Sequence, residues 1–184
     1  MVMVDGRGTA EQRRVQAVEA GLEAFADQGL TTAAIQQVAR RIGVSEPYVF
    51  RLFGSKQAFF MACVDELEAR VVETFTRAAR EATGDPLNEM GAGFRSLVSD
   101  GVVSGLWLQA CAVARGDQVV ASRCRALISN VLRLTQKYTD ASTEDLAVFL
   151  GRGAVVAMLQ SLGVDLREGS QAAVASLRDA GGAA

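Results

Sequence analysis

The chain has 184 residues, 49% of them hydrophobic, and a formal net charge of −2, an ordinary composition for a globular protein with a sizeable core. It contains no histidine, which removes the commonest general base and the commonest metal ligand. Its three cysteines are widely spaced, and it has neither a glycine-rich phosphate loop nor a nucleophile constellation. We therefore expect no enzyme activity, no cofactor, no metal and no disulfide scaffold.

The N-terminal segment is expected to be a flexible tail, residues 1–8, without the apolar core of a signal peptide. No apolar stretch approaches the ~18 residues that span a bilayer, so we expect a cytoplasmic protein without a membrane partner. A capping box is predicted at Thr9 and Gln12. The helix that follows is predicted to end at Gly29, with one apolar side made of Val15, Val18, Leu22 and Phe25.

Residues 32–56 show two helical patterns separated by a glycine. The first begins at Thr31 or Thr32, whose hydroxyl can cap it, and Gly43 supplies the backbone conformation that a tight turn needs. A second short helix follows, with Ser45 as its expected cap and proline in its first turn. Its inward side is predicted to be Val49, Leu52 and Phe53. This arrangement is typical of a helix-turn-helix, whose second helix enters the DNA major groove.

The charge distribution agrees with this interpretation. Residues 32–56 carry four basic side chains and one acidic, whereas residues 61–184 carry twelve basic and fifteen acidic. A local basic patch is sufficient for phosphate contacts. Lys56 opposes the dipole of the helix that it begins, which a DNA phosphate would compensate; the alternative is a solvated lysine. Arg13 and Arg14 are expected to be solvated, with contacts to DNA as the alternative.

Several short motifs resemble the DNA-binding segment of the tetracycline-repressor (TetR) family of bacterial transcriptional regulators. They are Gly29-Leu30-Thr31-Thr32, Val38-Ala39, Gly43-Val44-Ser45 and the run from Phe50 to Lys56. The resemblance covers about the first 60 residues in detail and implies DNA contacts from the exposed side of the motif. With Arg51 added from the helical pattern, the candidate DNA-binding residues are Thr32, Ser45, Glu46, Pro47, Tyr48, Arg51 and Lys56. Phe50 departs from the family, which usually has a tyrosine that touches a phosphate there.

The remainder of the chain is predicted to be all-helical. The expected helices are about Ser55–Ala82, Pro86–Ser104, one around Trp107 that ends at Gly116, Asp117–Tyr138, one from Ser142 to Leu162, and a weak one over Gln171–Leu177. The predicted fold is all-α with about nine helices. Residues 1–54 are assigned to a three-helix DNA-binding domain and residues 55–184 to a helical domain for effector binding and dimerisation.

The resemblance implies a small effector bound in the second domain. The predicted lining residues are Met90, Phe94, Trp107, Cys111 and Tyr138, together with Leu97, Val98 and Leu108. Their lack of charge favours a largely apolar effector; the alternative is an ordinary core without a cavity. Cys63 and Cys111 lie among apolar neighbours and are expected to be buried and inert, with a thiol sensor as the alternative.

A subunit interface is predicted on the helix of residues 142–162. Small or apolar side chains recur there at helical spacing, at Ala147, Gly151, Ala154, Met158 and Leu162. Such a stripe lets a partner backbone approach closely, although it equally fits packing within one domain. Helix-turn-helix proteins usually bind paired half-sites as twofold dimers, and the resemblance implies dimerisation through the last two main helices.

Together these patterns predict a homodimeric transcriptional regulator of double-stranded DNA. The expected form is a repressor that binds a palindromic operator and is released by a small, largely apolar effector. The alternative is a helical adaptor protein that has lost sequence-specific DNA binding, for which Phe50 gives some support. The operator, the regulated genes, the effector and the choice between repression and activation are not encoded in any pattern of this chain.

Overall fold

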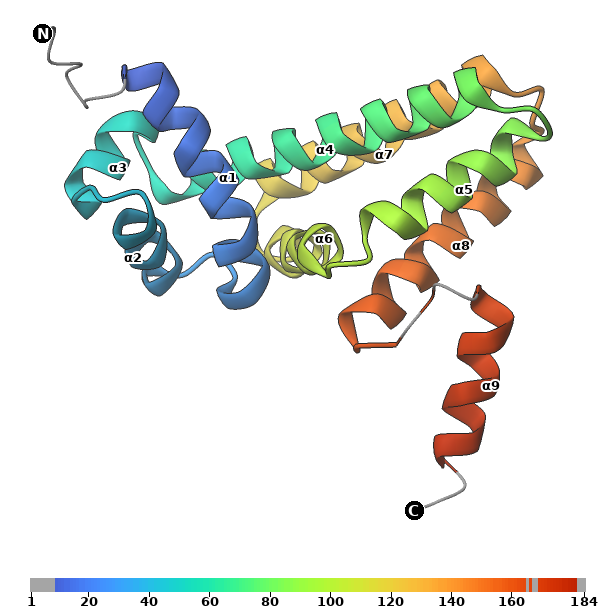
Figure 1. Ribbon diagram of the computed structural model, residues 1–184. Helices are drawn as coiled ribbons and strands as arrows, with labels where there is room; N and C mark the ends of the chain where they lie inside the picture. Colours follow the sequence, from blue (N-terminus) through green and yellow to red (C-terminus); the bar gives the residue numbers. More distant parts are fainter. Residues whose placement is uncertain (1–8, 165, 167–168, 182–184) are drawn as a thin grey trace, which may run out of the picture.

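The computed structural model describes residues 9–164, 166 and 169–181, which form helices joined by short turns (Figure 1). The predicted flexible tail, residues 1–8, lies outside the described residues. The helices are α1 (Ala10–Gln28), α2 (Thr32–Arg41), α3 (Glu46–Phe53), α4 (Lys56–Glu81), α5 (Pro86–Leu97), α6 (Val102–Ala114), α7 (Gln118–Tyr138), α8 (Thr143–Ser161) and α9 (Ser170–Gly181). The described chain is all-α as predicted, with a helix-turn-helix part followed by a larger helical part.

Helix α1 packs through small residues. Val15, predicted to face inward, is 62% exposed, which corrects that expectation. The buried positions are mainly small, and a Cβ atom added at Gly21 would lie 2.7 Å from Cys63 Sγ. Small side chains allow α4 and α6 to approach α1 closely. The buried face of α1 is therefore broader than the face predicted from the spacing of its large apolar residues. The small buried residues of α1 are Ala17, Ala20, Gly21 and Ala24.

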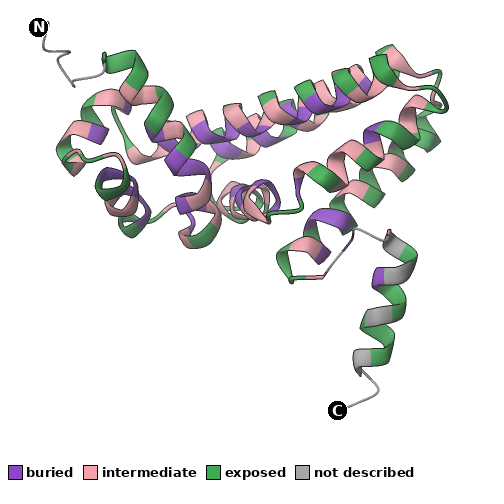
Figure 2. Cartoon of the chain, in the orientation of Figure 1, coloured by how far each residue is buried: buried purple, intermediate pink, exposed green. Residues whose placement is uncertain are grey.

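An aromatic contact joins α1 to the start of α4. Phe25 meets Phe59 and Phe60 edge-on, with ring centroids 5.1 and 5.2 Å apart, and all three side chains are almost fully buried. Edge-to-face pairs of this kind add to the free energy gained from burying apolar area. Figure 2 shows the buried residues concentrated where α1, α4 and α6 meet.

The segment from Pro86 to Ser104 was predicted as one helix and is in fact divided. Helix α5 ends at Leu97, and α6 begins at Val102 after Gly101, whose φ of 79° is readily adopted only by glycine. The two helices are bent by 91° relative to each other. The bend turns α6 back toward α1 and opens space between α5 and α7. By length and composition, none of the described helices taken singly could cross a membrane, although α5 and α6 pass that test as a bent pair.

The last two helices leave apolar surface exposed. Helix α8 begins with the predicted capping box, in which Asp145 N donates to Ser142 Oγ at 3.2 Å. Helix α9 is longer than the predicted Gln171–Leu177 and projects away from the bundle (Figure 1). Val174 and Leu177 on α9 are 60% and 43% exposed.

Candidate nucleic-acid interface and apolar cavity

The turn between α2 and α3 is held by backbone hydrogen bonds. Val44 N donates to Ala39 O at 2.9 Å, and Gly43 adopts a φ of 68°, which a side chain would strain. Thr31 is the cap of α2, and its hydroxyl accepts a hydrogen bond from Ala34 N at 3.2 Å. Val49 and Phe53 on α3 are buried and Leu52 is half-buried, as predicted. The opposite side of α3 therefore faces outward.

Arg13 and Arg14 hold α1 against this motif. An Arg13 guanidinium nitrogen donates to Ile42 O at 3.0 Å, and one of Arg14 donates to Leu52 O at 2.6 Å. The Arg14 guanidinium also lies 4.4 Å from the centroid of the Phe53 ring, a cation–π contact. Both arginines were expected to be solvated, or alternatively to touch DNA. Their described contacts instead tie α1 to the ends of α2 and α3.

The outward face of α3 carries the candidate base-contacting residues. Ser45 occupies the N-cap position, but its hydroxyl makes no capping hydrogen bond within the described chain, which corrects its predicted role. Pro47 is exposed, and Glu46 and Tyr48 are half-buried. The Arg51 guanidinium lies 4.6 Å from the centroid of the Tyr48 ring and therefore pairs with it on the same face. This face combines a free hydroxyl, a carboxylate and a stacked Tyr–Arg pair.

Two further candidates flank this face at helix N-termini. Thr32 is the exposed first residue of α2, and Lys56 is the half-buried first residue of α4. Ser55 Oγ caps α4 by accepting a hydrogen bond from Ala58 N at 3.0 Å. The basic patch is smaller than the sequence indicated, because Arg41 pairs with Glu23 on α1.

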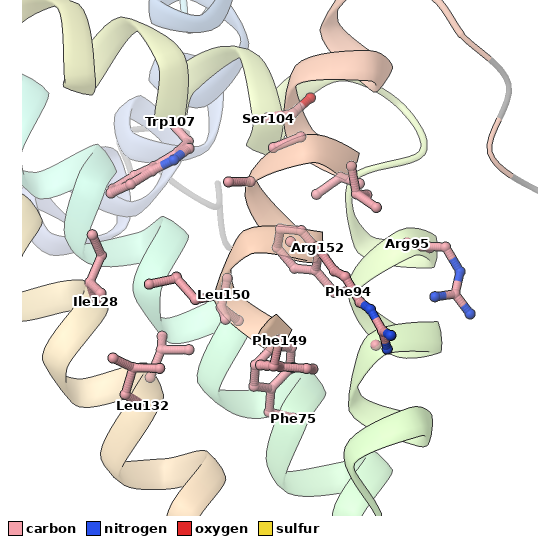
Figure 3. A pocket seen from close by; sticks show the side chains of 18 of the residues that line it. Phe75, Phe94, Arg95, Ser104, Trp107, Ile128, Leu132, Phe149, Leu150 and Arg152 are labelled. Carbon is pink, nitrogen blue, oxygen red and sulfur yellow. The ribbon is translucent and has the colours of Figure 1, made fainter. Parts of the chain in front are cut away.

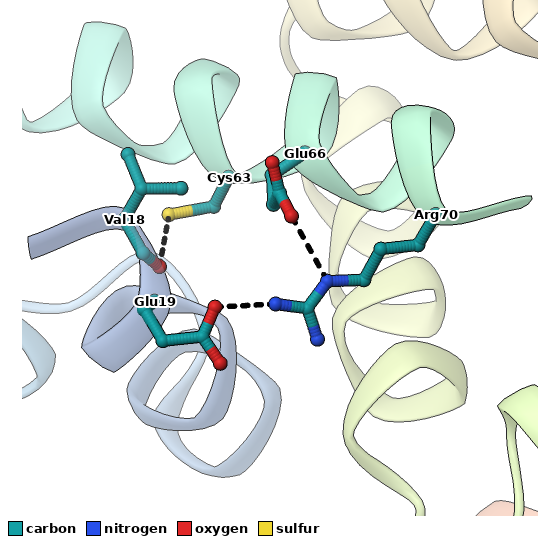
Figure 4. Close-up of polar contacts among 5 residues, drawn as sticks. All are labelled: Val18, Glu19, Cys63, Glu66 and Arg70. Carbon is teal, nitrogen blue, oxygen red and sulfur yellow. Dashed lines mark hydrogen bonds and ion pairs between the residues drawn. The ribbon is translucent and has the colours of Figure 1, made fainter. Parts of the chain in front are cut away.

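A polar cluster links α1 to the middle of α4 (Figure 4). The Arg70 guanidinium pairs with Glu19 of α1 and, at 3.0 Å, with Glu66 of α4. Beside it, Cys63 Sγ lies 3.7 Å from Val18 O. Burial raises the pKa of the Cys63 thiol well above its usual range, and the nearby carboxylates of Glu66 and Asp65 raise it further. This cysteine is therefore buried, as expected, and its raised pKa favours the unreactive thiol form.

A cavity of about 940 Å³ lies between α4, α5, α6, α7 and α8 (Figure 3). Its walls are mostly apolar, with aromatic side chains from four helices, α4, α5, α6 and α8. The residues of α4, α5 and α6 on its wall are Leu67, Val71, Phe75, Leu87, Asn88, Gly91, Phe94, Arg95, Val98, Val103, Ser104, Trp107, Leu108 and Cys111. Those of α7 and α8 are Leu127, Ile128, Val131, Leu132, Glu144, Asp145, Val148, Phe149, Leu150, Arg152, Gly153, Ala154, Val156 and Ala157.

Some of the predicted lining residues lie on this wall and others do not. Phe94, Trp107 and Cys111 line the cavity, as do Val98 and Leu108. Met90, Leu97 and Tyr138 are not on its wall: Met90 is fully buried, and Tyr138 lies at the C-terminal end of α7. Cys111 is exposed, contrary to the expectation of a buried thiol. The contributions of α4, of the middle of α7 and of α8 were missed, because only tertiary packing brings these helices to one space.

Aromatic side chains pack between α4, α5 and α8 at one edge of the cavity. Phe75 of α4 packs edge-on against Phe94 and Phe149, with ring centroids 6.2 and 5.6 Å apart. The rings of Phe94 and Phe149 each face a glycine of the other helix of the α5–α8 pair. A Cβ atom at Gly91 would lie 3.9 Å from Phe149 Cε2, and one at Gly153 would lie 3.8 Å from Phe94 Cε1.

Helix α6 joins the cavity to the helix-turn-helix part. Trp107 and Cys111 lie on the cavity wall, while Gly105 faces α1, where an added Cβ atom would lie 3.1 Å from Ala26 Cβ. The Gln109 side-chain amide donates to Ala26 O at 3.5 Å. Helix α4 makes a second connection, because its first residues pack under α3 and its later residues line the cavity. The sequence had indicated only the connection through α4.

The predicted stripe on α8 lies on the surface. All five of its members are exposed, and Met158 and Leu162 are 47% and 72% exposed. Between Leu146 and Val164 the sequence contains one charged residue, Arg152. A helix face this apolar and this exposed is typical of an interface. The exposed members of the stripe are Ala147, Gly151, Ala154, Met158 and Leu162.

The comparison with known families agrees with this geometry. The sequence profile described as "Bacterial regulatory proteins, tetR family" matches residues 17–63, which cover most of α1, the whole of α2 and α3, and the start of α4. Residues 17–63 therefore carry the DNA-binding segment typical of the TetR family. A curated relative, the HTH-type transcriptional activator FasR of Mycolicibacterium smegmatis, is 32% identical over 73 residues, or 40% of this chain. The match spans 33% of that relative, so the chain covers about a third of its length.

Solved structures extend the likeness of this chain beyond the matched segment. A TetR-like transcriptional regulator from Rhodococcus sp. RHA1 superposes with a TM-score of 0.58 and 24% identity, covering 85% of this chain and 86% of its own. A putative TetR-family regulator from Mesorhizobium loti MAFF303099 gives 0.56 and 15% identity, covering 78% of each chain. A putative transcriptional regulator from Pseudomonas aeruginosa PAO1 gives 0.53 and 21%, covering 86% and 82%. These identities establish a shared fold.

The family match thus covers the helix-turn-helix, and the solved structures show that the rest of the chain shares their helical fold.

Proposed function

We propose that the protein is a homodimeric, ligand-responsive repressor that binds a palindromic operator and releases it when a small, largely apolar effector enters the cavity. The observation that carries this proposal is the cavity of about 940 Å³ whose walls include α4 and α6, the two helices that also contact the helix-turn-helix part. A volume of this order suits a drug-sized ligand. A regulator of bacterial DNA acts in the cytoplasm.

DNA contacts are assigned by position and chemistry. Ser45, Glu46, Pro47 and Tyr48 are proposed to contact base edges in the major groove from the outward face of α3. Phosphate contacts are proposed for residues at the edge of that face, where side-chain cations and helix N-termini favour an anion. These phosphate-contacting residues are Thr32, Arg51 and Lys56.

The dimer is proposed to form through α8 together with α9. In one copy the α8 stripe and the α9 residues Val174 and Leu177 are exposed, and a second copy would remove this apolar area from water. The small side chains of Ala147, Gly151 and Ala154 would allow the two α8 helices to approach closely. Twofold symmetry would then present two copies of α3 to the two half-sites of a palindrome.

The proposed mechanism is a shift between two conformations. An effector releases DNA only through a difference in its affinity for the DNA-competent and DNA-incompetent forms. Filling the cavity would displace Trp107 and Cys111 on α6, and Gly105 on the same helix would carry the displacement to Ala26 of α1. Helix α4 would carry a parallel displacement to α3.

The experiment that tests this function is selection of bound sequences from a random duplex pool at two salt concentrations. We expect a short palindrome whose affinity falls steeply as salt rises, because phosphate contacts release counterions. In the recovered site, Lys56→Ala should weaken all sequences about equally, whereas Tyr48→Ala should change the preferred bases. A chain that enriches no sequence at low salt would instead be the helical adaptor.

The direction of regulation has a second candidate. The curated relative FasR is named as an activator, which favours activation as the alternative to repression. The two differ in where the operator lies relative to the promoter. A reporter fused to the recovered operator and its promoter decides between them: deletion of the gene raises expression under repression and lowers it under activation.

A further inference from the structure

Charged residues on the cavity wall indicate the chemical class of the effector, an inference that rests on the proposed effector-binding function. The described wall includes four charged side chains, and the two acidic ones have a role in α8. Asp145 accepts hydrogen bonds from the Ser142 backbone N–H at 2.9 Å and hydroxyl at 2.7 Å, which lower the pKa of its carboxyl group. Glu144 lies in the same first turn, where the helix dipole favours a carboxylate.

The two basic side chains have no such role. Arg95 of α5 and Arg152 of α8 make no side-chain hydrogen bond or ion pair with any other described residue. In contrast, Arg13, Arg14 and Arg70 all have polar partners between helices. The cavity wall therefore holds two guanidinium groups for which the described chain supplies no anion.

Both guanidinium groups belong to the crossing of α5 and α8. Arg95 follows Phe94 directly, and Arg152 precedes Gly153, the glycine that Phe94 faces. A Cβ atom at Gly91 would lie 3.7 Å from a terminal nitrogen of Arg95, so this side chain folds back along α5 beside the Phe149 ring. Figure 3 shows Arg95 on α5 and Arg152 on α8, both at this edge of the cavity.

We propose that the effector is an apolar molecule with one anionic group, a carboxylate in the simplest case. Arg95 and Arg152 bind that group at the α5–α8 crossing, and the apolar body lies in the cavity beside Phe149. Guanidinium groups suit this role because they present paired donors that match the two oxygens of a carboxylate. Arg152 is also the one charged residue in the 19-residue stretch Leu146–Val164. If a dimer buries this stretch, the anionic group of the effector would supply the partner that the Arg152 charge needs.

The test uses Trp107 as the probe, because it is the single tryptophan of the chain and lies on the cavity wall. The full-length protein is titrated with decanoate, 1-decanol and decylamine, each below its micelle concentration, and tryptophan fluorescence is recorded. We expect decanoate to bind about tenfold more tightly than 1-decanol, the factor that one charge-assisted hydrogen bond provides, and decylamine to bind most weakly.

The variants Arg95→Gln, Arg152→Gln and their combination test whether these two arginines cause the preference for decanoate over 1-decanol. The double variant should bind decanoate and 1-decanol equally, with unchanged affinity for the alcohol, while Arg80→Gln, at an exposed position near the end of α4, should keep the preference. The inference is overturned if wild type binds acid and alcohol equally, if the preference survives in the double variant, or if no probe changes the fluorescence. Sedimentation of Arg152→Gln separates a role in the dimer from a role in binding.

Operator binding in the same samples, without any probe, tests the proposed function separately. A protein that binds its operator but shows no acid preference refutes the anionic effector and leaves the regulator intact. A protein that prefers decanoate but binds no operator refutes the DNA-binding proposal and leaves the anion site intact.

Discussion

At the scale of single residues, Phe50 is the position where the chain departs most clearly from the TetR pattern. Its side chain lies on α3 and is 38% exposed, so the ring edge reaches the surface instead of supporting the core. A tyrosine hydroxyl would therefore fit there without displacing a buried neighbour. The departure removes one hydrogen-bond donor from the proposed DNA surface and leaves the fold of α3 unaffected.

We predict that Phe50→Tyr tightens operator binding. One added hydrogen bond to a phosphate contributes roughly 0.5–1.5 kcal/mol, or about two- to tenfold in affinity. Fluorescence anisotropy with the selected operator measures the change, and Phe50→Leu serves as a control that adds no donor. Equal affinities for Phe50→Tyr and wild type would show that this position does not face a phosphate.

The cysteines provide a second prediction at this scale. Cys111 is exposed on the cavity wall, whereas Cys63 is buried between α1 and α4. Burial raises the pKa of both thiols, so the reactive thiolate is scarce at neutral pH and increases as the pH rises. We expect iodoacetamide to alkylate Cys111 and to leave Cys63 unmodified in the folded protein, as followed by peptide mass spectrometry.

A cavity ligand should also slow alkylation of Cys111, and the rate should rise with pH. Cys111→Ser removes the fast-reacting site and serves as the control. Modification of Cys63 in the folded protein at the same rate as Cys111 would contradict the burial of that thiol.

At the scale of the elements, α6 is the helix whose role was least apparent in the sequence. It exists as a separate helix because the chain bends at Gly101, and the bend places one side of α6 on the cavity and the other on α1. Close packing at Gly105 makes this contact stiff, since a Cβ atom there would already lie 3.1 Å from Ala26 Cβ. A displacement of α6 on its cavity side would therefore displace α1 as well, because the tightly packed contact leaves no space to absorb the movement.

Gly105→Val should weaken the communication between the cavity and DNA. Overpacking against Ala26 should cost about 1–3 kcal/mol of folding free energy, visible as a lower Tm. Ligand titration by Trp107 fluorescence should persist, whereas ligand-induced release of the operator should require more ligand or fail. Gly84→Ala is the matched control, because no atom lies within 4 Å of its added Cβ. Normal operator release by a folded Gly105→Val protein would exclude α6 as the connection.

At the scale of the whole molecule, the exposed face of α8 and the projecting α9 leave a single copy with a large apolar surface. Val155, Met158 and Leu162 are each close to half exposed or more. Water contact with this area is unfavourable, and a second copy in twofold arrangement would remove it. Dimerisation would also set the distance between two α3 helices, the quantity that an effector changes in the proposed mechanism.

Met158→Glu should dissociate the dimer, because it places a charge at the centre of the apolar stripe without altering the core of one copy. Analytical ultracentrifugation should show monomers at micromolar concentration, and operator affinity should fall by about 100-fold or more as binding to two half-sites is lost. Ser122→Glu, at an exposed polar position of α7, should remain dimeric. A dimeric Met158→Glu protein would place the interface elsewhere.

The helix-turn-helix could be predicted because its signals are local. Caps at Thr9, Thr31 and Ser55, the turn at Gly43 and apolar spacing of three and four residues act within a few residues of each other. The same local signals predicted the capping box of α8 and the exposed stripe on that helix. They also identified the family, since its motifs lie in this short segment.

Other features depended on which helices meet. The break of the predicted Pro86–Ser104 helix, the exposure of Val15 and the partners of Arg13 and Arg14 all follow from contacts between segments far apart in the chain. The sequence alone determined an all-helical fold with a helix-turn-helix, because hydrophobic periodicity and caps are properties of neighbouring residues. Only the tertiary structure decided the walls of the cavity, the connection through α6 and the presence of Arg95 and Arg152 on one cavity wall, because these arise from packing between helices.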